Sequence, residues 1–510
     1  MRRSVGITRR HAAAGTLYDD EGMVSPAVIG ELAAAGYWGL RAPSEYGGSG
    51  CSLGDWAPFI AELAMVDTWV AGLSSPHAGL GPVNLLTTFG DDEQKGRLLP
   101  PLVSGQRLGA FAVTEPGTAS DWGAIRTTAV RDGDRFLLTG EKLFITNAVP
   151  GRTAAVLCTI DGRLAMLIVE LPDVENERFR TVPDETRAPR HVANRALIFD
   201  RLPVPAGNVL AADGRKIAYH GLNHGRVLVC AFAAGQLRAF AGTLIPWVRT
   251  RTTFGAVIGS RELVQRRLGR LAARIVACDA VLAWSAQLLD EGYRGELECV
   301  TAKVFGSEAM KDAAVDILLK TQGSRALLPG TRFADSLYDL LAPTVFEGEN
   351  EIITLGCFAS LAKARLAGPS RPRHPGDAPA QPSDLDGFTG FGGAVLRDSS
   401  AEIDAALARY GPELAVRQAD AIELAQRIQL ATVLLVVARY GARQDDPLVR
   451  QAALCMATEL GQQLSGRRGT PAYHRLVTDL GAAVAEDRFA PVATAAREPV
   501  AMPQHVEAAP

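Results

Sequence analysis

Hydrophobic positions follow a helical period through the first hundred residues and then change to a strand pattern. Apolar residues recur every three or four positions over 26–40, 56–66, 83–89 and 94–103, as on the buried face of a helix. From about residue 108 short runs of β-branched, aromatic and other apolar residues, typical of strands, lie at 126–131, 135–138, 156–160, 164–170 and 195–199. Asp132-Gly133-Asp134 and Asp161-Gly162 separate two pairs of these runs, which predicts hairpins. The pattern predicts a helical domain over 1–107 and a β domain over 108–217.

The helical period returns in the second half of the chain. Four long segments, 217–248, 261–290, 295–321 and 349–366, predict a four-helix bundle over 218–368. Five prolines among Gly, Asp and Ser indicate a linker over 369–398. Helical patterning resumes over 399–487 and predicts an extra domain, followed by an Ala/Pro-rich flexible tail over 488–510.

Composition narrows the class of protein. The chain has 510 residues, 47% hydrophobic and 21% charged, with a net charge of −3. These values favour a soluble multidomain protein and give no reason to expect nucleic-acid binding. Seven scattered cysteines without a CxxC pair favour a reducing compartment, and we expect the cytoplasm. His220 and His224 have helical spacing but no further ligands, so we expect no metal site.

Membrane contact is a further question that the apolar segments raise. We expect no run of the roughly 18 apolar residues that a membrane span needs. We expect the apolar stretch 430–438 to pack against the bundle, with peripheral membrane contact as the alternative.

Glu347 is the first candidate for chemistry. It lies between Phe346 and Gly348, after a Pro-containing loop and before an apolar run that predicts a helix. Burial beside an aromatic ring would raise the pKa of its carboxyl and improve it as a base near neutrality. Gly348 would let another molecule approach the backbone closely. From these residues alone, a solvated loop glutamate is the favoured interpretation, because isolated acidic loop residues are common.

Further motifs accompany Glu347. They read FAVTEPGTASD at 111–121, KLFITN at 142–147, LNHGR at 222–226, RTTFG at 251–255 and FEGEN at 346–350. The first is a strand that ends in small and hydroxylated residues, whose backbone N–H groups can meet a ligand's oxygens. The arginine of RTTFG suits a phosphate group. Each motif alone is also compatible with an ordinary strand or helix–helix turn.

In this order, the motifs resemble those of the acyl-CoA dehydrogenase family, most closely its very-long-chain branch, from about Asp19 to Gly368. The resemblance implies a mainly α fold with a central β domain. Its parts would be an N-terminal helical domain, a β-barrel domain and a C-terminal four-helix bundle, here followed by a helical extension.

The resemblance also implies the chemistry. An acyl thioester of coenzyme A or an acyl carrier protein would lose its α-proton to Glu347 and a β-hydride to FAD. Electrons would pass to an electron-transferring flavoprotein, and the protein would be a homodimer or homotetramer. The implied FAD-binding residues are Phe111, Val113, Thr114, Ser120, Phe144, Ile145, Thr146, Arg251, Phe254, Lys320, Gly323 and Glu349. The implied substrate-binding residues are Ser120, Asn223, Arg226 and Gly348.

The chain departs from the family pattern at several of these positions. Phe144 replaces a tryptophan that the family places against the flavin. Gly225 stands where some branches carry the base, which we interpret as room for a long acyl chain. Glu262 replaces a glutamine that reaches the adenosine half of FAD. We expect Lys320 or another cation to compensate the charge of Glu262, with FAD held less tightly than usual.

Three alternative functions remain open. An acyl-CoA oxidase would share the half-reaction, and Glu349, where dehydrogenases usually have threonine, favours it. A flavin monooxygenase of the same superfamily would lack the glutamate, so Glu347 argues against it. A catalytically silent assembly partner would retain the fold without the cofactor.

Overall fold

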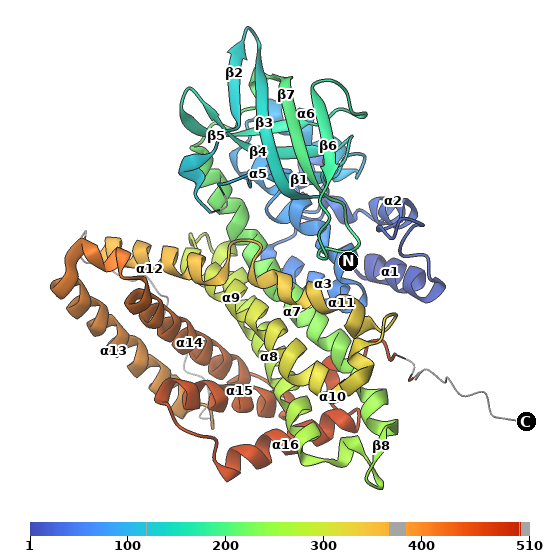
Figure 1. Cartoon of the computed structure of the whole chain (residues 1–510), viewed down its shortest axis with the longest axis vertical. Helices are drawn as coiled ribbons and strands as arrows, with labels where there is room; N and C mark the ends of the chain where they lie inside the picture. Colours follow the sequence, from blue (N-terminus) through green and yellow to red (C-terminus); the bar gives the residue numbers. More distant parts are fainter. Residues whose placement is uncertain (119, 367–383, 499, 501–510) are drawn as a thin grey trace, which may run out of the picture. The chain divides into compact units, whose positions relative to one another are not determined.

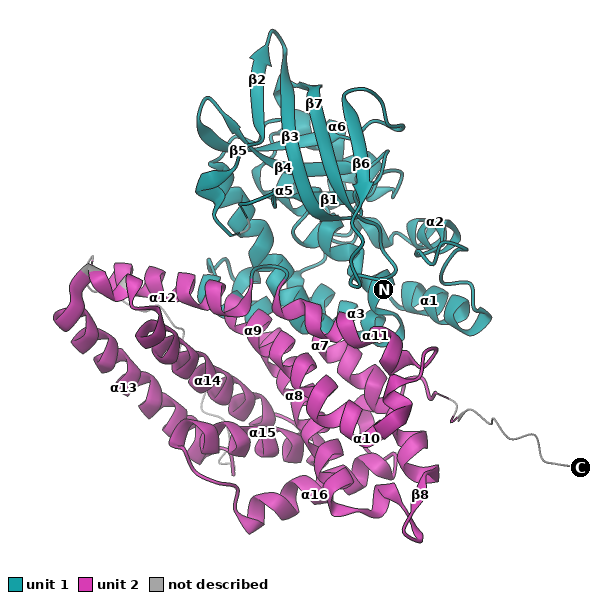
Figure 2. Ribbon diagram, viewed as in Figure 1, with its two compact units in different colours: residues 1–232, 285–299, 346–348 teal, residues 233–284, 300–345, 349–510 magenta. Residues whose placement is uncertain are grey.

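The computed structural model describes residues 1–118, 120–366, 384–498 and 500. Two compact units divide the chain (Figure 2). Unit 1 contains residues 1–232, 285–299 and 346–348, and unit 2 contains residues 233–284, 300–345 and 349–510. The predicted mainly α fold with a central β domain is confirmed (Figure 1).

Unit 1 begins with short helices and continues into one sheet. The helices are α1 (Arg2–Ala14), α2 (Pro26–Ala34), α3 (Leu53–Val66), α4 (Thr68–Gly72), α5 (Pro82–Phe89) and α6 (Asp92–Val103). The strands are β1 (Gly109–Ala112), β2 (Thr128–Asp132), β3 (Arg135–Thr146), β4 (Thr153–Ile160), β5 (Arg163–Glu170), β6 (Phe179–Pro183) and β7 (Asn194–Pro205). Their order is β1-β4-β2-β3-β7-β6, and β5 pairs with β4. Both predicted hairpins are present, because β2 pairs with β3 and β4 with β5, each antiparallel.

Most of unit 2 is helical. The long helix α7 (Gly214–Thr250) begins in unit 1 and ends in unit 2, before the short strands β8 (Thr252–Thr253) and β9 (Ala256–Val257). The bundle continues with α8 (Glu262–Asp290), α9 (Glu296–Asp312), a π-helical turn (Ala313–Leu319), α10 (Lys320–Gln322), α11 (Arg332–Leu341) and α12 (Asn350–Leu366). The extension contains α13 (Asp386–Tyr410), α14 (Gln418–Ala442), α15 (Pro447–Ser465) and α16 (Pro471–Ala485).

The extension packs on the bundle through an apolar cluster and a close helix crossing. Phe358 and Ala362 of α12 join Ile403, Leu414 and Ala425 in one buried cluster. A Cβ atom placed on Gly481 of α16 would lie 1.6 Å from the carbonyl oxygen of Gln265 on α8. Only a residue without a side chain allows the two backbones to approach this closely. Within unit 2 the extension thus packs against the bundle, although through residues other than the stretch 430–438 for which we expected it.

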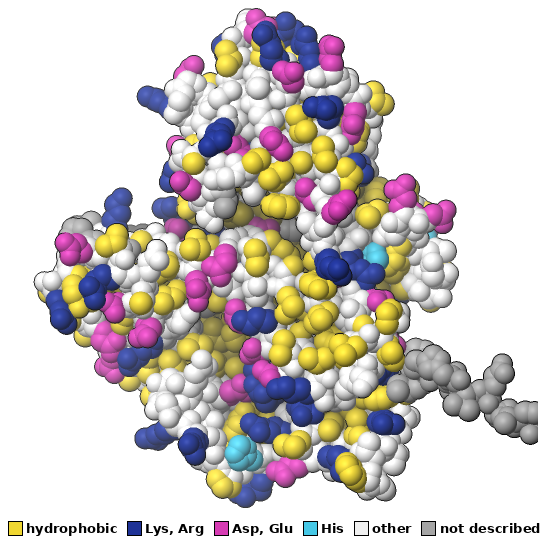
Figure 3. All heavy atoms as spheres, in the orientation of Figure 1, with side chains coloured by type: hydrophobic (Ala, Val, Ile, Leu, Met, Phe, Trp, Pro, Cys, Tyr) yellow, Lys and Arg dark blue, Asp and Glu magenta, His cyan; other side chains and the backbone are white. Residues whose placement is uncertain are grey.

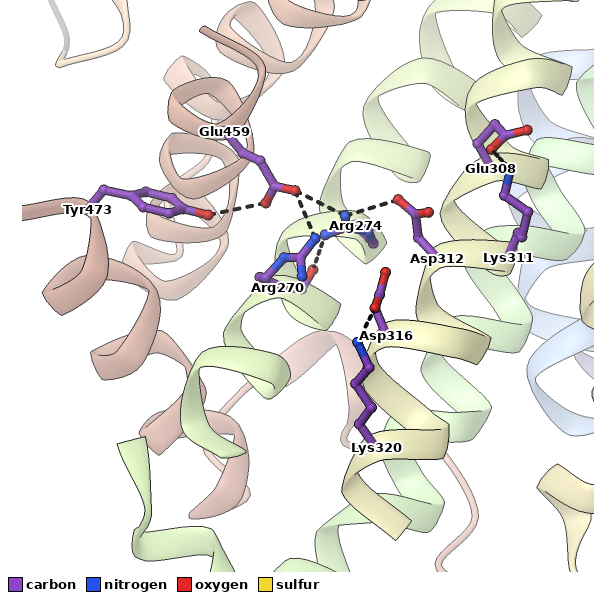
Figure 4. Close-up of polar contacts among 9 residues, drawn as sticks. All are labelled: Arg270, Arg274, Glu308, Lys311, Asp312, Asp316, Lys320, Glu459 and Tyr473. Atoms are coloured by element: carbon purple, nitrogen blue, oxygen red, sulfur yellow. Dashed lines mark hydrogen bonds and ion pairs between the residues drawn. The ribbon is translucent and has the colours of Figure 1, made fainter. Parts of the chain in front are cut away.

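A buried ion cluster adds to this contact (Figure 4). The Glu459 carboxylate of α15 accepts hydrogen bonds from Arg270 (3.2 Å) and Arg274 (3.0 Å) of α8, and from the Tyr473 hydroxyl of α16 (3.2 Å). Burial by itself raises the pKa of this carboxyl, but the charges of Arg274 and Arg270 outweigh burial and lower the pKa to about 2. The cluster therefore keeps Glu459 ionised at any physiological pH.

Several sequence predictions are corrected by these elements. The linker predicted over 369–398 ends earlier, because α13 begins at Asp386; its Gly- and Ser-rich first turns hide a helix whose Gly392 packs on Leu435. The rest of the predicted linker, residues 369–383, lies outside the described residues. The flexible tail predicted from 488 is wrong for residues 489–498, where Phe489 and Val492 are buried. The helix α11 and strand β6 had no predicted counterpart.

The expectation that no run could span a membrane is also wrong. By length and composition alone, α7, α8 and α14 are apolar enough to cross one. Of the 18-residue apolar stretch in each helix, 89% is buried inside the protein in α7, 72% in α8 and 44% in α14. Core packing accounts for most of this apolarity in α7 and α8.

The first prediction concerns the pH dependence of the Glu459 cluster. A pKa lowered from 4.5 to about 2 corresponds to about 3 kcal/mol of stability at neutral pH. This contribution is complete above pH 4.5 and is lost as the pH falls toward 2. Glu459→Gln should therefore destabilise the protein at pH 7, and its difference from wild type should shrink between pH 4.5 and 2. Unfolding midpoints across this range measure the effect.

The matched control is Glu402→Gln, which removes the same charge from a more exposed ion pair with Arg427. Exposed pairs contribute between about 0 and 1 kcal/mol, so this variant should differ little from wild type. A Glu459→Gln difference that stays constant on acidification would contradict the assignment.

Candidate active site

Glu347 lies in a reversed stretch of backbone between α11 and α12. Its φ is 58° and that of Gly348 is 98°. Two successive residues in the left-handed region turn the chain sharply, and this conformation is unfavourable for a glutamate. Surrounding contacts must therefore hold it, and such held outliers concentrate at functional sites.

Arg226 of α7 provides one of these contacts within unit 1. Its Nε donates to the Glu347 carbonyl oxygen at 3.3 Å, and its Nη1 donates to Asn223 Oδ1 at 3.3 Å. Asn223 in turn donates to the Arg294 carbonyl oxygen at 3.2 Å. Arg226 is 4% exposed, so its charge is held among these acceptors rather than in water. The structure thus places one predicted substrate-binding residue, Arg226, against the backbone of Glu347, and a second, Asn223, against Arg226.

Gly225 faces the Glu347 carboxylate. A Cβ atom at Gly225 would lie 3.1 Å from Glu347 Oε2 and 2.7 Å from Leu80 Cδ2. Our interpretation of Gly225 as room for a long acyl chain is therefore corrected, because the carboxylate and the Leu80 side chain take up this space. The glycine makes room for the base itself.

Lys303 of α9 holds the residues on both sides of the Glu347 segment. Its Nζ donates to the Thr344 carbonyl oxygen at 3.2 Å and to Asn350 Oδ1 at 2.6 Å. Asn350 also donates to Ser307 Oγ at 3.1 Å. Lys303 is fully buried, and a buried ammonium group is stable only with such acceptors. These bonds fix Thr344 and Asn350, the residues of unit 2 that flank the Glu347 segment.

Glu349 has a structural role at the start of α12. Its carboxylate accepts hydrogen bonds from the N–H groups of Glu351 and Ile352, both at 3.0 Å. This is the capping arrangement that satisfies the first N–H groups of a helix. Capping gives a reason for glutamate at a position that the resemblance assigns to FAD binding and that we interpreted as oxidase-like.

The two motifs implied to bind the flavin lie side by side in unit 1. The N–H of Leu143 donates to the Thr114 carbonyl oxygen at 2.9 Å, which joins the end of the β1 motif, with Phe111 and Val113, to β3. A register shift between Lys142 and Ile145 marks a β-bulge. Phe144 lies in this bulge with φ 58° and 57% of its surface exposed.

Contacts around the bulge hold it open. The Asp184 carboxylate accepts the Phe144 N–H at 3.0 Å, the bond that the bulge withdraws from the ladder. Thr146 Oγ1 donates to Asn194 Oδ1 at 3.5 Å. Of the other implied FAD-binding residues, Ile145 is buried and Ser120 is exposed. The bulge therefore presents an aromatic face that a planar ring can cover.

A buried ion pair supports the same bulge. Lys142 Nζ donates to Glu115 Oε1 at 2.7 Å and to the Val113 carbonyl oxygen at 3.0 Å. Glu115 also accepts the N–H groups of Arg126 (2.7 Å) and Thr127 (3.1 Å). Burial by itself raises the pKa of Glu115, but these bonds outweigh burial and lower its pKa. The pair fixes both flavin motifs to one point of the sheet.

The RTTFG motif forms the hairpin of β8 and β9 in unit 2. Phe254 at its tip has φ 47° and is 97% exposed. The Arg261 guanidinium lies 5.3 Å from its ring centroid, and that of Arg251 lies 5.9 Å from the Trp247 ring. Exposed hydrophobic side chains also gather on unit 2 near α11 in Figure 3. Such exposure is typical of a surface that binds another molecule.

The turn after α10 contains the other implied FAD-binding residues. Lys320 forms an ion pair with Asp316, and within the described residues no ion pair joins it to Glu262. The expected compensation of Glu262 by Lys320 is therefore not observed. Gly323 has φ 60°. The neighbouring Gln322 and Thr321 are buried, and Gln322 Nε2 and Thr321 Oγ1 have no hydrogen-bond partner among the residues that the structure describes. Polar atoms of this kind fit a polar ligand.

Three family models match the chain in succession. They are the acyl-CoA dehydrogenase N-terminal domain over residues 8–106, the middle domain over 110–201 and the C-terminal domain over 212–359. An acyl-CoA dehydrogenase of Bacillus subtilis (strain 168) is 32% identical over 333 residues, 64% of this chain and 86% of that protein. The chain belongs to the acyl-CoA dehydrogenase family.

Two further similarities refine this assignment. The very long-chain specific acyl-CoA dehydrogenase of Macaca fascicularis is 30% identical over 352 residues, 65% of this chain. The match spans about half, 52%, of that enzyme's length. The structure of an acyl-CoA dehydrogenase from Bacillus anthracis, complexed with FAD, has a TM-score of 0.78 at 20% identity. The structural match covers 94% of this chain and 92% of the Bacillus anthracis chain. The similarity in fold therefore continues beyond the residues that the family models match and into the extension.

Sequence reasoning missed several residues around these sites. Lys303, Leu80 and Asp184 were not singled out, and Lys142 was named only as part of the KLFITN motif. A charged residue inside an apolar helical run is a sequence signal for Lys303, because a buried charge needs a partner. Nothing local marks Leu80 or Asp184, whose roles arise from residues distant in the chain.

We predict that Lys303→Met slows turnover without emptying the flavin site. Loss of the ammonium group frees both flanks of the Glu347 segment, and misplacement by about 1 Å can cost roughly 100-fold in rate. Turnover per bound flavin should fall at least tenfold while the visible flavin absorbance is retained. Lys311→Met, on the same helix but partly exposed, is the control. Equal turnover in the two variants would contradict the role of Lys303.

A separate prediction concerns Gly225. Gly225→Ala should displace the Glu347 carboxylate or the Leu80 side chain by a few tenths of an ångström and lower kcat by roughly tenfold. Because Leu80 is the closer neighbour, adding Leu80→Ala should restore part of the lost activity. Steady-state kinetics of the single and double variants measure this, and an undiminished kcat in Gly225→Ala would show that the contact is unimportant.

Proposed function

We propose that this protein catalyses the α,β-dehydrogenation of an acyl thioester to the trans-2-enoyl thioester, with Glu347 as the base and FAD as cofactor. The observation that carries the proposal is the position of the Glu347 carboxylate. It faces a glycine on α7, and a buried arginine holds its backbone. Membership of the acyl-CoA dehydrogenase family supports the reaction class.

Removal of an α-proton by a carboxylate needs help, because the α-hydrogens of a thioester are very weakly acidic. The helpful interaction is a hydrogen bond to the thioester carbonyl, which stabilises the negative charge that develops there. The Glu347 N–H is the donor that we assign, since the reversed backbone at 347–348 is fixed by Arg226. Glu347 takes the proton, and Arg226, Asn223 and Ser120 help to position the substrate.

The described residues fit FAD in each unit considered separately. In unit 1 the exposed face of Phe144 and the hydroxyls of Thr114 and Thr146 suit the flavin ring. In unit 2 Arg251 and the buried polar atoms of Gln322 suit the phosphate and adenosine half. When bound, FAD supplies the acceptor for the β-hydride.

Exposure of Phe254 supports a homo-oligomer in which this hairpin contacts a second copy of the chain.

The natural electron acceptor of the proposed dehydrogenase would be an electron-transferring flavoprotein. The oxidase alternative would return electrons to oxygen, and it loses its particular support because helix capping accounts for Glu349. Stoichiometric hydrogen peroxide during aerobic turnover would favour the oxidase.

The central test is Glu347→Gln. Glutamine keeps the size of the side chain and removes its basicity, so the rate of flavin bleaching by an acyl thioester should fall by roughly 10²–10⁴-fold. FAD content and substrate binding should remain. Anaerobic stopped-flow absorbance measures the rate.

Glu351→Gln provides the matched control, because it removes an exposed carboxylate four residues further along. It should bleach at the wild-type rate. Bleaching by Glu347→Gln at a similar rate would overturn the assignment of the base.

A further inference from the structure

The last described residues of the chain return to the bundle of unit 2. We call residues 489–498 the C-terminal strap. Phe489 and Val492 are buried, and the Pro491 carbonyl oxygen accepts a hydrogen bond from Arg238 Nε of α7 at 3.1 Å. A Cβ atom at Gly242 would lie 2.5 Å from the Ala496 carbonyl oxygen. The strap therefore lies directly on the backbone of α7.

Glu498 ends the strap with one ion pair and one hydrogen bond from a backbone N–H group. One carboxylate oxygen accepts from Arg325 Nη2 at 2.9 Å, and the other accepts from the Arg332 N–H at 2.9 Å. The Arg325 side chain is 2% exposed. A hydrogen bond between charged groups at this depth is stronger than a neutral one and leaves a costly buried charge when it is removed. Glu498 thus joins the end of the strap to the turn that follows α10 and to the start of α11.

Arg325, which Glu498 holds, also contacts the side chain of Gln322. Its Nη1 donates to Gln322 Oε1 at 3.1 Å. Because a guanidinium group can only donate, the atom that it contacts must be the amide oxygen, so the amide nitrogen points elsewhere. That nitrogen is fully buried and has no hydrogen-bond partner within the described residues. Gln322 is therefore held in one orientation that leaves its donor available.

Trp247 holds the same turn from α7. Its Nε1 donates to the Thr321 carbonyl oxygen at 3.0 Å, and the Arg325 guanidinium lies 5.4 Å from its ring centroid. The turn 321–325 is thereby fixed by α7 on one side and by the strap on the other. The buried hydroxyl of Thr321 likewise has no partner among the described residues.

We infer that the C-terminal strap positions the turn 321–325 for the adenosine half of FAD, with Glu498 acting through Arg325 on Gln322. This inference rests on the proposed function, because it assigns the ligand of the turn from the family resemblance at Lys320 and Gly323. It gives the extension a part in cofactor binding. Glu498 and Arg325 are positioning residues, and the Gln322 amide nitrogen is the donor that meets the cofactor.

The test is the affinity of the apoprotein for FAD, followed by quenching of flavin fluorescence. Glu498→Gln removes the charge and keeps the shape, and FAD should bind roughly tenfold more weakly. Glu486→Gln is the matched control, because it removes the same group from an exposed ion pair of the extension. Its affinity should equal that of wild type. Trp247→Phe, which removes the Nε1 donor to Thr321 and reduces the ring that the Arg325 guanidinium faces, should also weaken FAD binding.

A second readout separates positioning from general loosening. At saturating FAD, Glu498→Gln should be bleached by substrate at the wild-type rate, because neither Glu347 nor the Phe144 bulge belongs to this cluster. Unchanged affinity in both Glu498→Gln and Trp247→Phe would overturn the inference, as would an equal fall in affinity and bleaching rate. A wild-type protein that binds no FAD would instead refute the proposed function itself.

Discussion

A charge removed from water must be met by fixed acceptors, and this constraint shapes the segment that carries Glu347. The backbone at Glu347 and Gly348 lies in a conformation that a glutamate does not prefer. A buried cation holds it, and a second one fixes the flanking residues in unit 2. Arg226 binds the Glu347 carbonyl oxygen, and Lys303 binds Thr344 and Asn350 on its flanks. The glycine on α7 then leaves room for the carboxylate, so one arrangement both fixes the backbone and directs the base.

Buried ion pairs also fix a turn or attach a distant segment at three other places in the described part of the chain. Lys142 joins the two flavin motifs through Glu115, Arg274 attaches α15 through Glu459, and Arg325 attaches the strap through Glu498. Buried ion pairs contribute little net stability, because desolvation offsets most of their attraction. Their value here is geometric, since each buried charge accepts few alternative arrangements. We therefore regard them mainly as determinants of position; removing one partner, as in Glu459→Gln, is still costly because it leaves the other charge buried and unpaired.

How far the sequence predicts this molecule depends on the range of the interactions involved. The helical period of the hydrophobic residues predicted the starts of α7, α8 and α12 to within three residues of the observed starts, because one face of each helix is continuously buried. Local turn chemistry predicted both hairpins. The predictions of a linker up to 398 and of a flexible tail from 488 were wrong. They rested on the glycines of α13 and on the alanines and prolines of the strap, and tertiary contacts override such weak local preferences. Glu347 and Arg226 were found through the family resemblance, whereas the partners of Lys303, Gly225 and Glu498 lie far away in the chain.

The most direct test of the account is an anaerobic titration of the purified, FAD-loaded protein with acyl thioesters of graded length on coenzyme A and on an acyl carrier protein. Flavin absorbance reports reduction, and mass spectrometry reports the product. We expect at least one thioester to bleach the flavin in a one-to-one ratio and to become lighter by two hydrogens. A protein that retains FAD and is bleached by none of them would contradict it.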